Sequence, residues 1–149
     1  MIDKSNRYDS LFQYYGEKYV MEWLVIKAQA IAESNLDPFA KSPVGASGLM
    51  QFMAPTWAEW WQRIHPARVL GSRTDPERSI ELGTAYMQHL VVRFGDLPNA
   101  QAAYNWGWGR MKNHLQITGG SLQPDLLPAE TRGYLQRIER KYGELKRLA

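Results

Sequence analysis

Hydrophobic residues recur at helical spacing early in the chain, between positions 20 and 32. The positions three or four residues apart are Val20, Trp23, Leu24, Ala28 and Ile31, and the remaining sides carry Val25, Ile26, Ala30 and Ala32. A helix that is apolar on most sides is predicted to lie at the centre of a fold. We expect it to end before Asp37-Pro38, because a proline disfavours helical backbone in the residue before it. Glu33 therefore stands at the end of a buried helix.

Two further helices are predicted in the middle of the chain. In residues 55–64, Thr56 and Glu59 match a capping box. One face of this helix is formed by Trp57, Trp60, Trp61 and Ile64. In residues 74–95, Asp75 is predicted as the N-cap, with Pro76 as the first helical residue and Gly95 as the stop. The apolar stripe of this second helix is Ile80, Met87, Leu90, Val91 and Phe94.

The rest of the chain also favours helices. Residues 8–19 are predicted as a helix, and residues 97–109 as a short helix closed by Gly107 and Gly109. Residues 118–128 are expected to form a loop, and a last helix begins near Pro128-Ala129. Its inward face is Leu135, Ile138, Tyr142 and Leu145. No convincing strand alternation and no repeat are visible, so the chain is predicted to be one compact, mostly α-helical domain over residues 1–149.

Composition narrows the range of functions. The net charge is +3 and no basic run is dense enough for a nucleic-acid interface, so no nucleic-acid partner is expected. The chain has no cysteine, and therefore needs no disulfide. No segment has the apolar core of a signal peptide or the length of a membrane span, so neither a cleaved signal nor membrane insertion is expected.

Glu33 is the first candidate for chemistry. A carboxylate at a helix C-terminus faces the negative end of the helix dipole, and apolar neighbours remove it from water. Both effects raise the pKa, as a general acid requires. The stretch from Gly45 to Gly48 must bend tightly or admit another group closely. It contains no G-x-S-x-G nucleophile elbow.

Metal and cofactor chemistry finds no support in the sequence. The three histidines are isolated and lack the spacing of metal ligands; they are His65, His89 and His114. No metal site and no cofactor are therefore expected.

Four segments together resemble the soluble lytic transglycosylase (SLT) domain, whose fold is lysozyme-like. They are "ESNLDPFAKSPVGASGLMQFMAPT", "DPERSIELGTAYM", "AAYNWGWGR" and "PAETRGYLQRI", and they occur in the family's order and spacing. The resemblance covers roughly residues 20–142. It implies a lysozyme-like helical domain that acts on the glycan strands of peptidoglycan, and we expect that domain to be a monomer.

The resemblance also implies roles for individual residues. Glu33 matches the family's single catalytic acid and base. The positions that match the family's substrate-contacting residues are Ser34, Ser42, Gln51, Met53, Tyr104, Asn105, Glu130 and Tyr134. Two positions depart from the family: Ser79 replaces an asparagine, with an expected local structural effect, and Trp106 replaces a small residue. The bulk of Trp106 is expected to narrow or re-line the sugar site.

The resemblance implies a reaction without water. Glu33 would protonate the oxygen between N-acetylmuramic acid (MurNAc) and N-acetylglucosamine (GlcNAc), and the sugar's own 6-hydroxyl would close a 1,6-anhydro ring. Three alternatives stay open. They are a hydrolytic goose-type muramidase on the same scaffold, a non-catalytic wall-binding module, and a helical interaction protein with chance motifs. Delivery to the wall is expected through a holin, a phage virion or secretion machinery, or as a fragment of a larger protein.

Overall fold

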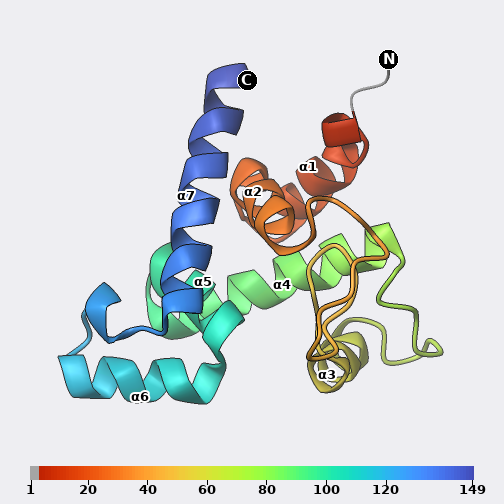
Figure 1. Ribbon diagram of the computed structural model, residues 1–149. Coiled ribbons are helices and arrows are strands. Elements are labelled where there is room, and N and C mark those ends of the chain that lie inside the picture. Colours follow the sequence, from red (N-terminus) through yellow and green to blue (C-terminus); the bar gives the residue numbers. More distant parts are fainter. Residues whose placement is uncertain (1–3) are drawn as a thin grey trace.

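The computed structural model describes residues 4–149, and this range is mostly helical, with long turns between some of the helices (Figure 1). The α-helices are α1 (Asp9–Lys18), α2 (Trp23–Ser34), α3 (Ala54–Ile64), α4 (Pro76–Phe94), α5 (Leu97–Trp106), α6 (Trp108–Thr118) and α7 (Ala129–Leu148). Two 3-10 turns, η1 (Lys4–Asn6) and η2 (Pro124–Leu126), complete the elements. The described residues form no strand, only isolated bridges of Ser47 with Lys41 and with Phe52. The predicted mostly α class is confirmed, whereas residues 1–3 of the expected 1–149 domain lie outside the described residues.

Helix α2 is buried through its middle, as its apolar pattern predicts. It packs against α7 on one side and α1 on another, and α4 in turn packs against α1, α3 and α5. Residues 25–30 are all buried. Two of these are polar: Lys27 forms an ion pair of 2.6 Å with Asp9 of α1, and Gln29 is fully buried. The helix ends at Ser34, because the left-handed backbone of the next residue, Asn35 (φ 53°), stops it two residues before Asp37.

The predicted ends of α4 are confirmed. The Asp75 side chain accepts hydrogen bonds from the backbone N–H groups of Glu77 and Arg78, and Pro76 occupies the first turn. Gly95 ends the helix with φ 92°, a value that glycine adopts without the steric cost of a Cβ. The predicted stripe faces the core, with Val91 only partly buried.

The capping box predicted for α3 is wrong. The helix begins at Ala54 and its N-cap is Met53, so Thr56 already lies inside the first turn. Pro55 explains the earlier start, because its ring presets helical φ and it has no N–H to satisfy. Glu59 instead pairs with Arg63 at 3.0 Å. The predicted face is confirmed, since Trp57, Trp60 and Trp61 are buried.

Helix α6 is missing from the sequence prediction. Gly107 ends α5 as predicted, but Gly109 lies within α6 and stops no helix. At Gly107 the backbone takes φ 108° and ψ 144°, which lets the chain turn and start a new helix at the next residue. The buried positions of α6 are Met111 and His114, and the polar ring of His114 hid the apolar stripe. The predicted loop over residues 118–128 is correct except for Thr118, which ends α6, and the 3-10 turn η2.

Helix α7 closes the fold along α2 and confirms the predicted inward face. Ile138 is buried, and Leu135, Tyr142 and Leu145 are partly buried against the core. A small cluster of Ala28, Tyr134 and Ile138 fills the α2–α7 contact, and the larger cluster fills the space around α4. The chain termini of the described part lie at one end of the molecule (Figure 1).

The turn that joins α2 to α3 provides a test of packing. Gly48 has φ 88°, and a Cβ at this position would overlap the carbonyl oxygen of Arg73. Gly45 has a similar φ of 99° but open space around it. We expect Gly48→Ala to reduce the free energy of unfolding by at least ~3 kcal/mol, and Gly45→Ala by only ~1 kcal/mol, the left-handed backbone cost alone. Chemical denaturation of both variants checks this, and equal losses would contradict the packing argument.

Candidate active site

Glu33 is the next-to-last residue of α2 and its side chain is half-buried. The hydroxyl of Tyr134, a fully buried residue of α7, donates a hydrogen bond of 3.0 Å to Glu33 Oε2. Burial raises the pKa of Glu33 from 4.5 to about 8, the largest effect. The Tyr134 hydrogen bond and the charge of Arg137 lower this pKa, and the charge of Glu130 raises it. The structure therefore confirms the predicted direction, and burial is its main cause.

Ser34 ties the end of α2 to the glycine turn. Its Oγ lies 3.0 Å from the carbonyl oxygen of Ala30 and 2.8 Å from that of Leu49, within hydrogen-bond distance of both. The next two residues, Asn35 and Leu36, both have positive φ, at 53° and 61°. For a leucine this backbone is strained, and such strain clusters at functional sites. The strained pair turns the chain sharply away immediately after Glu33.

The glycine turn over residues 40–52 is held by hydrogen bonds rather than by regular structure. Gln51, at φ 51°, donates from Nε2 to the carbonyl oxygens of Ala40 (3.0 Å) and Gly48 (2.9 Å). Ser42 Oγ accepts from the backbone N–H of Ala46 at 3.0 Å. Two of the predicted substrate-binding side chains thus also shape the loop that carries them.

Tyr104 connects the turn to the interior. Its hydroxyl donates a hydrogen bond of 2.7 Å to the carbonyl oxygen of Met50. Burial and then the charge of Glu33 raise the pKa of Tyr104 far above its usual range. Its ring lies against those of Phe52 and Tyr86, with centroids 6.1 Å and 5.2 Å away. Glu33, Tyr104, Tyr134 and the turn therefore form one group of neighbours.

The other predicted site residues lie at the edge of this group. Glu130, in the first turn of α7, is exposed, yet its charge acts on Glu33. Asn105 follows Tyr104 and is half-buried. Met53, the N-cap of α3, is 42% exposed and so lies at the surface. Their expected contacts with a glycan stay predictions.

The two departures from the family have visible contacts. Ser79 is fully buried, and its Oγ accepts a hydrogen bond of 3.1 Å from the backbone N–H of Met50, which is the kind of local structural role that was predicted. Trp106 is half-buried, and its ring meets that of His114 of α6 edge-on at 5.8 Å. This contact joins α5 to α6. The predicted narrowing of the sugar site by Trp106 stays a prediction.

Two residues near the site were missed in the sequence. Gln29 lies one helical turn before Glu33, and its fully buried side chain is close to Tyr134. Neither Gln29 Nε2 nor Oε1 has a hydrogen-bond partner among residues 4–149. Tyr86 packs between Tyr104 and Trp60, with both centroids 5.2 Å away. The sequence signal for Gln29 was a glutamine within an otherwise apolar helix. Tyr86 had no such signal, because its contacts with Tyr104 and Trp60 come from other helices.

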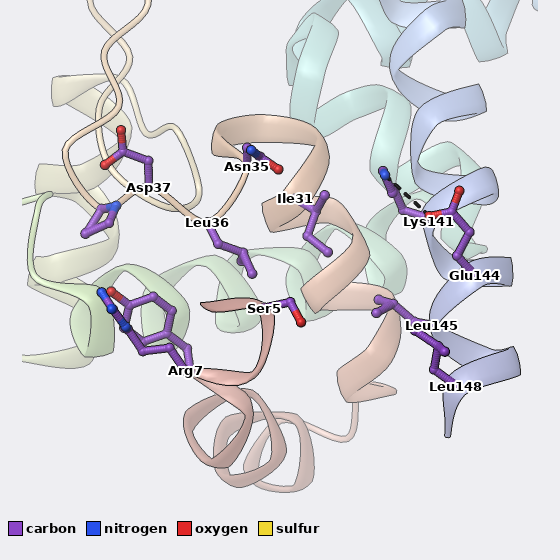
Figure 2. A pocket seen from close by; sticks show the side chains of 12 residues that line it. Ser5, Arg7, Ile31, Asn35, Leu36, Asp37, Lys141, Glu144, Leu145 and Leu148 are labelled. Carbon is purple, nitrogen blue, oxygen red and sulfur yellow. Dashed lines mark hydrogen bonds and ion pairs between the residues drawn. The ribbon is translucent and has the colours of Figure 1, made fainter. Parts of the chain in front are cut away.

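Glu33 lines none of four surface cavities, so the predicted cleft around it stays a prediction. The largest of the four, about 540 Å³, begins directly behind the end of α2 (Figure 2). Figure 2 shows Asn35, Leu36 and Asp37 on one side and the ion pair of Lys141 with Glu144 on the other. A second cavity of about 460 Å³ borders Tyr86.

Each histidine has a local contact of its own. His65 pairs with Glu81 at 2.6 Å, His89 packs on Trp60, and His114 Nε2 accepts from the backbone N–H of Gln123. Within residues 4–149, no group of three or more acidic, histidine or cysteine side chains is arranged to hold a metal ion. None of the helices in the same range has both the length and the apolar character needed to cross a bilayer.

Comparison with known proteins places this geometry in a family. The family model described as the transglycosylase SLT domain matches residues 10–124. The chain belongs to the SLT domain family. The match includes Glu33 and Tyr104 but ends before α7, which carries Glu130 and Tyr134.

Longer relatives share this SLT domain. The soluble lytic murein transglycosylase of Salmonella typhimurium is 36% identical in an alignment of 139 residues that covers 88% of this chain and 22% of that protein. The 70 kDa soluble lytic transglycosylase of Escherichia coli superposes with a TM-score of 0.81 at 33% identity, over 92% of this chain and 24% of that one. The predicted lysozyme-like helical fold is therefore confirmed. The chain spans about a quarter or less of the length of these relatives.

Another solved structure is also similar to this chain. An inactive Glu-to-Gln mutant of the lytic transglycosylase Slt from Pseudomonas aeruginosa superposes with a TM-score of 0.80 at 25% identity. This match covers 95% of the SLT domain described here and 25% of that chain.

The raised pKa of Glu33 predicts a pH-dependent stability. A carboxyl group whose pKa is higher in the folded chain binds more protons when folded, so its contribution to stability falls as pH rises from about 4.5 to about 8. Glu33→Gln removes the charge that burial disfavours. We expect the variant to melt at least ~3 °C above the wild type at pH 9, with the difference vanishing near pH 4. Glu17→Gln, at an exposed position of α1, should show no such trend; a pH-independent difference for Glu33→Gln would contradict the burial argument.

Tyr134→Phe tests the hydrogen bond to Glu33. The bond favours the charged carboxylate, so its loss should raise the pKa of Glu33 above about 8. Carbon NMR titration of the labelled Glu33 carboxyl group measures this directly. Tyr142→Phe is the matched control, because the Tyr142 hydroxyl makes a bond of 2.6 Å to Glu22 across the same pair of helices. An unchanged Glu33 pKa in Tyr134→Phe would refute the assignment of this bond.

Proposed function

We propose that the chain is a peptidoglycan lytic transglycosylase domain that cuts the β-1,4 bond between MurNAc and GlcNAc without consuming water. The observation that carries the proposal is Glu33, a half-buried carboxyl group with a pKa of about 8 and a hydrogen bond from Tyr134. Such a group keeps its proton at neutral pH, as an acid that protonates a glycosidic oxygen must. The relatives named lytic murein transglycosylases support the substrate and the reaction.

In the proposed first step, Glu33 donates its proton to the oxygen that links the two sugars. Tyr134 donates to Oε2, which leaves Oε1 to carry the proton. As the bond to C1 breaks, the acetamido group of MurNAc stabilises C1 and the Glu33 carboxylate forms. The Tyr134 bond becomes stronger at that point, because hydrogen bonds to charged groups contribute roughly 1.5–3 kcal/mol. Proton transfer by a positioned group contributes roughly 10²–10⁴-fold to the rate.

In the second step, the same residue acts as a base. The Glu33 carboxylate, held in a site that disfavours its charge, removes the proton from the 6-hydroxyl of MurNAc, and the oxygen closes onto C1. The proton lost to the leaving sugar is thereby returned. The product is a 1,6-anhydro-MurNAc end, and neither a metal nor a cofactor is required.

The structural bonds of five other carboxylates support a mechanism in which Glu33 is the single acid. Most glycosidases use a second carboxylate that attacks the sugar or activates water. The five candidates elsewhere in the chain each make a structural bond: Asp37 to the N–H of Phe39, Glu59 to Arg63, Asp75 and Asp96 as helix caps, and Glu77 to the Tyr15 hydroxyl. Glu130 is the exception, since it is exposed and acts on Glu33 through its charge.

We further propose the substrate contacts and the setting that the family resemblance implies. The glycan would meet Ser42, Gln51 and Met53 on the turn, Tyr104 and Asn105 on α5, and Glu130 on α7. Ser34 would act on substrate indirectly, through its contact with Leu49. The domain of residues 1–149 would work as a monomer at the cell wall, delivered by a holin, a phage virion or secretion machinery, or as part of a longer protein.

The proposal is tested by the products of purified sacculi digested in heavy-oxygen water. Ring closure predicts anhydro-MurNAc ends that carry no label at C1 and resist borohydride, read by mass spectrometry. The matched control is Glu33→Gln, which should release no muropeptides while remaining folded.

Two other outcomes would overturn the proposal. Labelled, reducible MurNAc ends would show a muramidase, which the exposed Glu130 carboxylate would serve by positioning water. An intact wild-type preparation that binds sacculi and releases nothing would show a wall-binding module.

A further inference from the structure

A second cavity of about 460 Å³ adjoins the candidate active site. We call it the basic pocket, and it is lined by Glu59, Trp60, Arg63, Tyr86, His89, Arg93 and Trp108. These residues come from α3, α4 and the first residue of α6; Figure 1 shows α3 and α6 on the same side of α4. Tyr86 belongs both to the pocket and to the aromatic group of the site, because its ring lies 5.2 Å from that of Tyr104. The basic pocket therefore begins one aromatic ring away from Tyr104.

The cations of the basic pocket are held on aromatic rings. The guanidinium carbon of Arg93 lies 4.5 Å from the centroid of Trp108; Lys112, which does not line the pocket, has its Nζ 5.2 Å from the same ring. Arg63 lies 4.7 Å from the centroid of Trp60. Stacking of this kind fixes a guanidinium in place and leaves the N–H donors in its plane available for a planar anion.

The charges of the pocket do not balance. Its one carboxylate, Glu59, is already paired with Arg63. Arg93 makes no ion pair with any carboxylate in residues 4–149. The positive charge of the pocket also acts on His89. Its pKa is lowered first by burial and then by the charges of Arg63 and Arg93. A guanidinium that is held in place and has no anion can bind a carboxylate strongly, often through two parallel hydrogen bonds.

We propose that the basic pocket binds a carboxylate of the peptide carried by the glycan strand, with Arg93 as its main anchor and Arg63 in support. The proposal rests on peptidoglycan as the substrate of the neighbouring site. Where the peptide is attached, the sugars of that strand are uncharged, because the lactyl carboxyl group of MurNAc forms the amide to the peptide, whereas the peptide carries free carboxylates. The pocket would thus select strands that still bear their peptides, a property separate from the chemistry at Glu33.

Binding to the Glu33→Gln variant of the 149-residue chain tests this selection without turnover. The probes are three glycan oligomers of equal length: one with its peptides, one stripped of peptides with its lactyl carboxylates capped as simple amides, and one whose peptide carboxylates are amidated. Calorimetry should give a dissociation constant at least ~10-fold lower for the first than for the other two, about 1.4 kcal/mol of binding free energy. Adding Arg93→Gln should abolish this preference, whereas Arg140→Gln, which removes the same charge from the exposed face of α7, should preserve it.

The outcomes separate this proposal from the proposed function. Equal affinities for all three probes would overturn peptide recognition, while the wild type could still form anhydro products. Tight binding of the amidated probe would show that the peptide is held by something other than its carboxylates, which also overturns the assignment. Equal weakening of all probes by Arg93→Gln would make the pocket a sugar site. Failure of the proposed function is seen in a different measurement: the wild-type chain would release no anhydro products from any of these strands.

Discussion

The burial of the Glu33 carboxyl group where α2 meets α7 is the constraint on which the packing of these two helices and the chemistry of the site depend. A carboxylate placed there would be desolvated at a high cost, so burial raises the pKa of the group to about 8. Tyr134 limits this effect by donating to Oε2, and its hydroxyl can do so only because α7 packs along α2. The apolar character of α2 follows from the same requirement, since its last turn must reach the interior before the chain leaves at Asn35.

The second side of the site lacks regular structure and depends on the backbone of Met50. Its carbonyl oxygen accepts from Tyr104, its N–H donates to the buried Ser79, and its side chain packs close to Gly83. Arg73 reinforces the turn by donating to the carbonyl oxygens of Gly45 and Phe52. Because these partners come from α4, α5 and the α3–α4 connection, the turn is formed only when the rest of the fold is in place. Local sequence cannot specify such a loop alone.

Sequence was most informative where local chemistry and burial agree. The period of α2 and the Asp75 and Gly95 ends of α4 were predictable, because a cap and an apolar stripe each act over a few residues. The start of α3 was not, since Pro55 outweighs the capping pair of Thr56 and Glu59. In the site, Glu33 could be inferred from its position, but Tyr134 came from family resemblance, as it lies 101 residues away. The basic pocket had no linear signal, because its cations and rings come from three helices.

The positive charge of the basic pocket would lower the pKa of Glu33 if it lay beside that residue, and the fold keeps the two apart. A guanidinium close to Glu33 would stabilise its carboxylate and lower its pKa, and the acid would lose its proton at neutral pH. Among the described cations, Arg137 alone contributes noticeably in this direction, whereas the charges of Arg63 and Arg93 act on His89. Tyr86 and Tyr104 lie between the basic pocket and the acid as uncharged rings. An anionic substituent could therefore be held on α4 and α6 while Glu33 on α2 keeps the proton that cleavage requires.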